Sequence, residues 1–165
     1  MEFLDIVDKN DQIVGKASKD AVYKKMLCHR ISHVLIFNDE DKMILQKRGS
    51  NVSFCPNHWS TAVGGHVQAG ETYEEAALRE YQEELGAKSA LEFIGKDFYN
   101  VPDIPNKFLA AFKTKFNGPF NPDLDVVSEV GAFDMEDIKK MIKNGEKFHP
   151  ELIFILEKYC FTKLN

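Results

Sequence analysis

Three glutamates are spaced so that their carboxylates share one side of a helix. Glu80, Glu83 and Glu84 occupy positions i, i+3 and i+4, and these intervals make side chains neighbours on a helical surface. Like charges at such spacings repel, and we expect Arg79 to point about 100° away from Glu80 and to leave them unbalanced. A hard divalent cation such as Mg²⁺ relieves this repulsion, because it binds a few carboxylates and also takes water and phosphate oxygens. The cluster therefore predicts a metal site that acts on a diphosphate.

Glycines precede this helix and serve the same site. Gly64, Gly65 and Gly70 allow sharp turns and a close approach of the backbone where the chain leaves a strand and enters the helix. The alternative interpretation of the segment is a solvated acidic helix face that follows a flexible turn.

The stretch GGHVQAGETYEEAALREYQEELGA, residues 64–87, resembles the Nudix box. That pattern is Gly, five residues, Glu, seven residues, Arg-Glu, two residues, Glu-Glu, one residue and Gly. The sequence matches every fixed position, with Gly65, Glu71, Arg79, Glu80, Glu83, Glu84 and Gly86. Only aliphatic positions depart from the pattern, at Tyr81 and Ala87, and these changes alter packing and leave the charges intact.

The resemblance implies an α/β protein with the Nudix fold, a mixed β-sheet sandwiched between α-helices. It also implies Mg²⁺- or Mn²⁺-dependent hydrolysis of a diphosphate linked to another group, by attack of metal-activated water. In the family, carboxylates that match Glu80, Glu83 and Glu84 bind the metal. The structural residues of the box are those that match Glu71, Arg79 and Gly86.

The general base varies among members of this family, and two candidates stand out here. Glu83 belongs to the box, whereas Glu129 lies in the segment Ser128-Glu129-Val130, which we expect to be a loop beyond the sheet. Together with Glu84 they form the predicted catalytic set. An exposed acid without a catalytic role is the alternative for Glu129.

Substrate contacts are expected from one arginine and from the start of the box. Arg48 ends a predicted strand beside Lys47 and can hold a phosphate through two parallel hydrogen bonds. Gly64, Gly65 and His66 complete the predicted substrate-binding set. A surface position at a strand end is the alternative for Arg48.

Segments outside the box resemble one branch of the family, the type I isopentenyl-diphosphate isomerases and their hydrolase-like relatives. The matching segments are Asp5-Ile6-Val7-Asp8, His29-Arg30, Leu45-Gln46-Lys47-Arg48 and Trp59-Ser60-Thr61. In the isomerases, histidines that match His29 and His66 help to bind a divalent metal. The alternative to metal binding is a structural role for each histidine: His29 as the first residue of a strand and His66 as a hydrogen-bond donor in a loop.

This sequence lacks residues that carry out the isomerase reaction. The isomerases place a Cys immediately before the Gly-His pair that corresponds to Gly65-His66, and this sequence has Gly64 there. Their second acidic motif would fall near 101–107, where Asp103 is the only acid. A complete box without the Cys favours a hydrolase. An isomerase-like enzyme and a non-catalytic binding or regulatory Nudix module are the alternatives.

Composition limits the class of protein and its partners. The 165 residues carry a net charge of −5, which argues against a basic nucleic-acid coat protein. The 44% of hydrophobic residues is a globular value, and no apolar run reaches the roughly 18 residues of a membrane helix. Three cysteines without a CxxC motif favour a reducing cytoplasm over a disulfide framework. The expected partner is a small-molecule diphosphate, and a homodimer through the edge of the N-terminal hairpin is possible.

We expect a single Nudix domain over 1–165, with an N-terminal hairpin and short helix in 1–28 and the box in 65–87. The capping pair Thr72 and Glu75, with Gly86 as a stop, predicts a helix over 73–85. Further strands are expected at 3–7, 13–17, 31–37, 43–46, 91–99, 107–116 and 129–133. Further helices are expected at 18–26, 134–144 and 150–160. Residues 49–58 are expected to form a loop.

Overall fold

The computed structural model describes residues 1–161. Its strands are β1 (Phe3–Val7), β2 (Ile13–Ser18), β3 (His29–Phe37), β4 (Met43–Arg48), β5 (Trp59–Thr61), β6 (Val63–His66), β7 (Glu92–Tyr99), β8 (Lys107–Lys115) and β9 (Val127–Phe133). Its helices are α1 (Lys19–Lys24), α2 (Tyr73–Leu85), α3 (Met135–Lys143), α4 (Pro150–Ile155) and the π-helix η1 (Leu156–Phe161).

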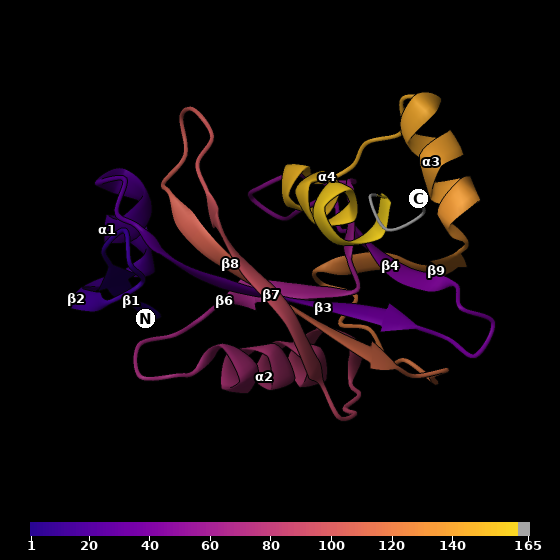
Figure 1. The fold of residues 1–165 in the computed structure, drawn as a ribbon, viewed down its shortest axis with the longest axis horizontal. Helices are drawn as coiled ribbons and strands as arrows, with labels where there is room; N and C mark the ends of the chain where they lie inside the picture. The colour runs from indigo at the N-terminus through magenta and orange to yellow at the C-terminus, as the bar shows by residue number, and fades with distance from the viewer. Residues whose placement is uncertain (162–165) are drawn as a thin grey trace.

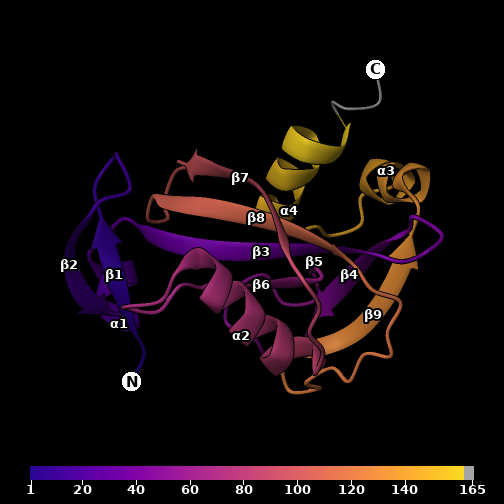
Figure 2. The ribbon, with the colours of Figure 1, turned by 60° about the horizontal axis from the view of Figure 1, so that its bottom comes forward.

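A mixed seven-stranded sheet forms the middle layer of the molecule (Figures 1 and 2). Its path runs β5-β4-β3-β8-β7, with β6 paired to β3 and β9 paired to β4. β3 and β8 are parallel, and their near-continuous apolar residues suit strands that are covered on both faces. The register places His29 opposite Lys107, so these two strands begin at the same edge of the sheet.

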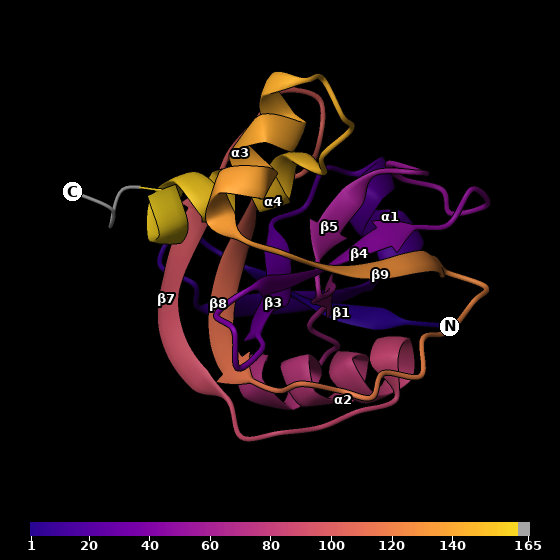
Figure 3. The same ribbon diagram turned by 90° about the vertical axis from the view of Figure 1, so that its right-hand side faces the viewer.

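Helix α2 covers one face of the sheet, and α3 and α4 lie on the other (Figure 3). The capping box of Thr72 and Glu75 is present, and Gly86 ends α2 in the left-handed conformation with a φ of 60°. The predicted helix over 73–85 is confirmed. Its buried residues are Ala76, Ala77, Tyr81 and Leu85, whereas Leu78 is 37% exposed.

The opposite face buries the C-terminal elements in a second core. Leu152, Ile155 and Leu156 of α4 and η1 pack with Leu35 and Trp59 of the sheet. The helix expected from Pro150 is therefore present, but its second half is π-helical. Among residues 1–161, no helix combines the length and the apolar character that crossing a membrane requires.

The N-terminal hairpin of β1 and β2 lies at one end of the sheet together with α1, which Ser18 caps (Figure 1). Two side chains anchor this unit to the rest of the chain. Asp5 accepts a hydrogen bond from the Gly70 N–H at 3.0 Å, and Arg30 donates from Nε to Asp11 at 2.7 Å. The hairpin is thus anchored to the loop that precedes α2 and to strand β3.

One expectation about a loop is wrong, and strand β6 lies outside the ranges of the expected strands. The chain around Val63 and Gly64 forms strand β6, which pairs with β3, although two adjacent glycines favour a turn locally. Glu129 lies in strand β9 opposite Lys47, not in a loop, because β9 extends to Val127 and completes the sheet beside β4.

Candidate active site

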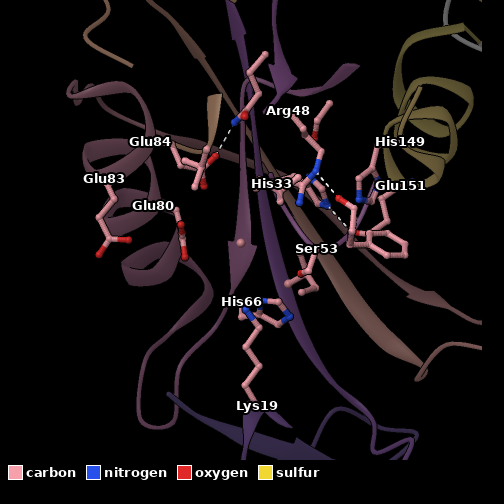
Figure 4. Close-up of a pocket in the computed structure, with 18 of the residues that line it drawn as sticks. Lys19, His33, Arg48, Ser53, His66, Glu80, Glu83, Glu84, His149 and Glu151 are labelled. Atoms are coloured by element: carbon pink, nitrogen blue, oxygen red, sulfur yellow. Dashed lines mark hydrogen bonds and ion pairs between the residues drawn. The ribbon is translucent and has the colours of Figure 1, made fainter. Parts of the chain in front are cut away.

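A cavity of about 700 Å³ lies between α2, the sheet and the start of α4 (Figure 4). Glu80, Glu83 and Glu84 of α2 line one side, and we call them the carboxylate wall. The opposite side, the cationic wall, consists of His33, Arg48, Lys107 and His149, together with Glu151. The three predicted metal-binding glutamates therefore do share one surface, and that surface faces a cavity.

Glu84 is the most enclosed member of the carboxylate wall. Burial raises the pKa of Glu84, and the neighbouring carboxylate of Glu80 raises it further. The Gln46 amide counters this by donating to Glu84 Oε1 at 2.5 Å, while the same amide also donates to the Ala62 carbonyl. The backbone N–H of Gly64 is a second donor to Glu84. Glu84 is thus held by strands β4 and β6 in an environment that lacks sufficient positive charge.

Arg79 does contact the carboxylate wall, so the expectation that it leaves these acids unbalanced is wrong. Its Nη1 donates to Glu80 at 2.9 Å and to Glu83 at 3.3 Å. Its Nε and Nη2 donate to the two oxygens of Glu71 at 2.6 and 3.0 Å, and these bonds help to raise the pKa of Arg79. The Cα–Cβ bond of Arg79 points away from the carboxylate wall. Its long side chain bends along the helix, however, so the guanidinium reaches the carboxylates of Glu80 and Glu83.

The donor set of the carboxylate wall suits a hard divalent cation. Within residues 1–161, no three Asp, Glu, His or Cys side chains converge as a metal site, because Glu80 and Glu83 turn toward Arg79. Carboxylate oxygens are nevertheless the ligands that Mg²⁺ and Mn²⁺ prefer, and burial together with the neighbouring Glu80 carboxylate raises the pKa of Glu84.

The two glycines of β6 separate the walls and are required for different reasons. A Cβ on Gly65 would overlap the carboxyl group of Glu80. A Cβ on Gly64 would lie 3.0 Å from Nδ1 of His33, on the cationic wall. The predicted importance of these glycines thus has a steric basis, since each admits a side chain that lines the cavity.

The cationic wall joins three elements of the fold, β3, β8 and α4, through buried hydrogen bonds. Glu151 Oε1 lies 2.9 Å from Nε2 of His33, and its Oε2 accepts from Nζ of Lys107 at 3.0 Å. Burial alone would raise the pKa of Glu151, but the hydrogen bond with His33 and the charge of Lys107 hold it well below its usual range. Among the residues of the cationic wall, Arg48 alone was predicted from the sequence as a site residue.

Arg48 lies where the sequence placed it, at the end of β4 and on the cavity. Its Nε donates to the carbonyl of Phe54 at 2.9 Å, which orients the guanidinium and fixes the loop beside it. Glu129 is not among the residues that line the cavity, whereas Asp123 is, and sequence reasoning missed Asp123. The backbone N–H of Asp123 donates to the Glu84 carbonyl at 2.9 Å, so this loop closes over the end of α2.

Two histidines and a tyrosine form an aromatic cluster near the N-terminal hairpin. The rings of His29 and His66 stack with centroids 5.5 Å apart, and His66 Nε2 lies 2.7 Å from the hydroxyl of Tyr23. Burial lowers the pKa of His29 to about 4 and that of His66 to about 3, so both rings are neutral. His66 lines the cavity, and His29 lies behind it.

Comparisons with known proteins identify the family. The model of the NUDIX domain matches residues 28–154. An uncharacterized Nudix hydrolase of a Nostoc species is 36% identical, with 96% of each chain covered. Another from Streptomyces coelicolor is 35% identical over 88% of this chain and 81% of its own. An isopentenyl-diphosphate Δ-isomerase of Photorhabdus laumondii is 28% identical over 87% of this chain and 84% of its own, in agreement with the predicted branch.

Solved structures share the fold. A crystal structure of a Deinococcus radiodurans protein superposes with a TM-score of 0.83 and 23% identity, covering 97% of this chain and 99% of that chain. The Nudix domain of Shewanella oneidensis NrtR, in complex with ADP-ribose, has a TM-score of 0.63 and 18% identity over 78% and 84% of the two chains. The matched domain, the complete box on α2 and the mixed sheet between helices show that this chain belongs to the Nudix family.

Proposed function

We propose that the protein hydrolyses a diphosphate linkage in a small-molecule substrate with the help of Mg²⁺ or Mn²⁺. One observation carries the proposal: Glu80, Glu83 and Glu84 all face a cavity large enough for such a molecule. Nudix enzymes as a group use divalent cations, and here these three side chains would hold the ion. When bound, the cation activates a water for attack on phosphorus and offsets the charge that develops on the leaving oxygen.

The other proposed roles, orienting a ligand, accepting a proton and binding phosphate, fall to individual side chains of the site. Gln46 and the Gly64 N–H fix the orientation of Glu84 as a ligand. Glu83 lines the cavity and its side chain is 58% exposed, whereas Glu129 does not line the cavity, so geometry favours Glu83 over Glu129 as the base that takes a proton from the attacking water. Arg79 is a positioning residue that joins the loop at Glu71 to the helix. Arg48 would bind a phosphate oxygen of the substrate.

An isomerase-like reaction is disfavoured by the side chains that line the cavity. Gly64 offers no thiol where the isomerases carry one. The segment 101–107 contributes Ile104 and Lys107 to the cavity, and its only acid, Asp103, does not line it. The segment that would carry the second acidic motif of the isomerases thus brings a lysine to the cavity and no acid.

A mass-spectrometric screen with Mg²⁺ tests the proposal. The panel contains nucleotide sugars, ADP-ribose, dinucleoside polyphosphates, NADH, coenzyme A and prenyl diphosphates. The complex of the NrtR domain with ADP-ribose and an Ap4A hydrolase of similar fold from Caenorhabditis elegans justify two of these classes. We expect cleavage within a diphosphate. Formation of an allylic isomer without phosphate release would support the isomerase, and no turnover with any compound would support a binding module.

We also propose a compartment and an oligomeric state for the protein. None of Cys28, Cys55 and Cys160 forms a disulfide among the described residues, which supports our proposal of a reducing cytoplasm. Strand β2 pairs only with β1 within residues 1–161, and its exposed Ile13 and Val14 support the proposal of a homodimer through this edge. Sedimentation analysis of the purified protein measures the oligomeric state.

A further inference from the structure

One end of the cavity is built by residues that precede the matched domain. The NUDIX match begins at residue 28, whereas β1, β2 and α1 lie within residues 3–24. We call these three elements, with Glu2 before them, the N-terminal unit. The unit contributes Glu2, Lys19, Asp20 and Tyr23 to the lining of the cavity. Figure 4 shows Lys19 at the His66 end of the cavity, away from the cationic wall.

Tyr23 and His66 form a hydrogen-bonded pair at this end. The Tyr23 hydroxyl lies 2.7 Å from Nε2 of His66, and both side chains line the cavity. The low pKa of His66 keeps its ring neutral, so the ring has one N–H and one bare nitrogen. If the hydroxyl donates to Nε2, the pair still offers Nδ1–H and the hydroxyl oxygen. If Nε2–H donates instead, the pair offers the hydroxyl proton and a bare Nδ1. Either way, one donor and one acceptor remain, and neither has another partner within residues 1–161.

This combination of one donor and one acceptor matches a hydroxyl group. A hydroxyl both donates and accepts, whereas phosphate oxygens only accept and a hydrocarbon chain does neither. The other polar groups of the N-terminal unit at the cavity are two carboxylates and one ammonium, and Lys19 Nζ lies 3.8 Å from Glu2. Carboxylates accept hydrogen bonds from hydroxyls and repel a further phosphate. This end of the cavity therefore suits a hydroxyl-bearing group better than an anion or an alkyl chain.

Asp11 fixes the N-terminal unit to three other elements. It lies in the turn between β1 and β2, and its side chain is 5% exposed. Arg30 of β3 donates to Oδ1 at 2.7 Å, while Lys96 of β7 and Tyr73 of α2 donate to Oδ2 at 2.7 and 2.8 Å. Burial alone would raise the pKa of Asp11, but these hydrogen bonds hold it below its usual value. One buried acid thereby holds the hairpin, and α1 after it, against the elements that carry the rest of the cavity.

We propose that the N-terminal unit forms the subsite for the group attached to the diphosphate of the substrate, and that this group carries hydroxyls. Tyr23 is the specificity-determining residue, and Asp11 is a positioning residue that acts through the unit. The inference rests on the proposed function and narrows its substrate class to diphosphates joined to a sugar or another polyhydroxylated group. Prenyl diphosphates, whose chains have no hydroxyl, are poorer substrates.

Binding to a variant with slow turnover tests the role of Tyr23. The parent protein is Glu83→Gln with Mg²⁺ present, so that the compound is not consumed during calorimetry. ADP-ribose and UDP-glucose are the hydroxyl-bearing probes, and dimethylallyl diphosphate is the probe without hydroxyls. Adding Tyr23→Phe keeps the ring and removes one hydroxyl, so the affinity for a hydroxyl-bearing probe should fall at least about threefold. The affinity for dimethylallyl diphosphate should be lower in the parent and unchanged by Tyr23→Phe.

Tyr159→Phe is the matched control for this series. Its hydroxyl donates to Asp97, and Tyr159 does not line this cavity. The control should bind each probe as the parent does. Unchanged affinity for both hydroxyl-bearing probes in Tyr23→Phe would overturn the inference, and so would an equal loss for dimethylallyl diphosphate or a parent that binds neither hydroxyl-bearing probe.

Asp11→Asn in the otherwise wild-type enzyme tests the positioning role. For a hydroxyl-bearing substrate that the enzyme cleaves, we expect KM to rise at least about threefold with kcat within about twofold, and amides of β1 and β2 to exchange faster than those of β3. The matched control is Asp8→Asn in the same turn, whose carboxylate accepts only from the N–H groups of Asn10 and Gln12 within residues 1–161. A lower Tm with unchanged KM would show that Asp11 only stabilises the fold.

The two sets of measurements separate this inference from the proposed function. Binding of ADP-ribose or UDP-glucose that weakens in Tyr23→Phe, without hydrolysis of any compound by the wild type, contradicts the proposed function alone. Hydrolysis of a hydroxyl-bearing compound with the same KM in the wild type and in Tyr23→Phe contradicts the inference alone.

Discussion

The two walls of the cavity have opposite charge and opposite origins in the chain. The carboxylate wall comes from five consecutive residues of one helix, Glu80 to Glu84. The cationic wall comes from residues up to 118 positions apart, His33 and Glu151, which meet only in the fold. The carboxylate wall is formed by acids alone, whereas on the cationic wall one acid, Glu151, contacts both His33 and Lys107. A wall encoded within one helix can be identified from the sequence, and a wall assembled from distant segments cannot.

The largest effect is expected from removal of a carboxylate on α2. Glu83→Gln and Glu84→Gln should each lower turnover at least ~100-fold, because a missing ligand or base disables the attack on phosphorus. Phosphate release with Mg²⁺ measures the effect. Glu74→Gln, at an exposed position of the same helix, is the matched control and should stay near the wild-type rate. Near-normal rates for both active-site variants would refute the assignment of the carboxylate wall.

Removal of the acid on the cationic wall is expected to lower the free energy of unfolding. Glu151→Gln leaves the buried ammonium of Lys107 without its acid and is expected to cost about 3 kcal/mol at pH 7. The folded pKa of Glu151 lies below its usual 4.5, so its contribution is present above pH 4.5 and is lost as the pH falls below that value. The difference between wild type and variant should therefore shrink in acid. Urea unfolding between pH 3 and pH 7 measures it.

Glu157→Gln on the exposed side of η1 is the control for that series and should change stability by less than about 0.5 kcal/mol. A gap between wild type and Glu151→Gln that stays constant over the whole range would show that Glu151 contributes nothing through its charge.

The adjacent glycines of β6 allow each wall to be disturbed separately. Gly65→Ala displaces the mobile end of Glu80, so we expect turnover to fall about tenfold with little change in Tm. Gly64→Ala presses on the ring of His33 and should raise KM more than it lowers kcat. Steady-state kinetics on both variants provide the comparison. Identical kinetic defects would show that the two walls act as one unit.

Arg79→Lys tests the internal counterion of the carboxylate wall. Lysine cannot reproduce the paired bonds to Glu71 and the bonds to Glu80 and Glu83, so we expect a loss of about 1 kcal/mol and a several-fold lower turnover. Thermal unfolding and kinetics measure the two effects. An increase in turnover would indicate that Arg79 mainly competes with the metal.

The smallest effect is expected at Glu129. Its side chain lies on β9 outside the residues that line the cavity, so Glu129→Gln should keep turnover within about twofold of the wild type. A loss as large as that of Glu83→Gln would make Glu129 the general base. The pH dependence of kcat in the two variants adds a second measurement, because loss of the base removes the acidic limb.

Local signals account for what the sequence predicted. The cap at Thr72, the apolar spacing and Gly86 are all encoded within one helix, so α2 and its acidic face could be found directly. Strands β3 and β8 followed from their apolar residues. The pairs of Glu151 with His33 and Lys107 could not be found, since they depend on packing between distant segments. The direction of the Arg79 guanidinium was predicted wrongly, because helix geometry fixes the Cα–Cβ direction and not the position of the end of a flexible side chain.

The pairing of Glu151 with His33 and Lys107 restricts how related proteins diverge. A change of Lys107 or His33 to an uncharged residue alters the charge balance that Glu151 maintains, so substitutions at these positions should occur together in homologous sequences. The glutamates of α2 lie outside this ion network and can stay constant. Coordinated replacement of a few buried residues can thus change one wall of the cavity while the acidic face of α2 is inherited unchanged.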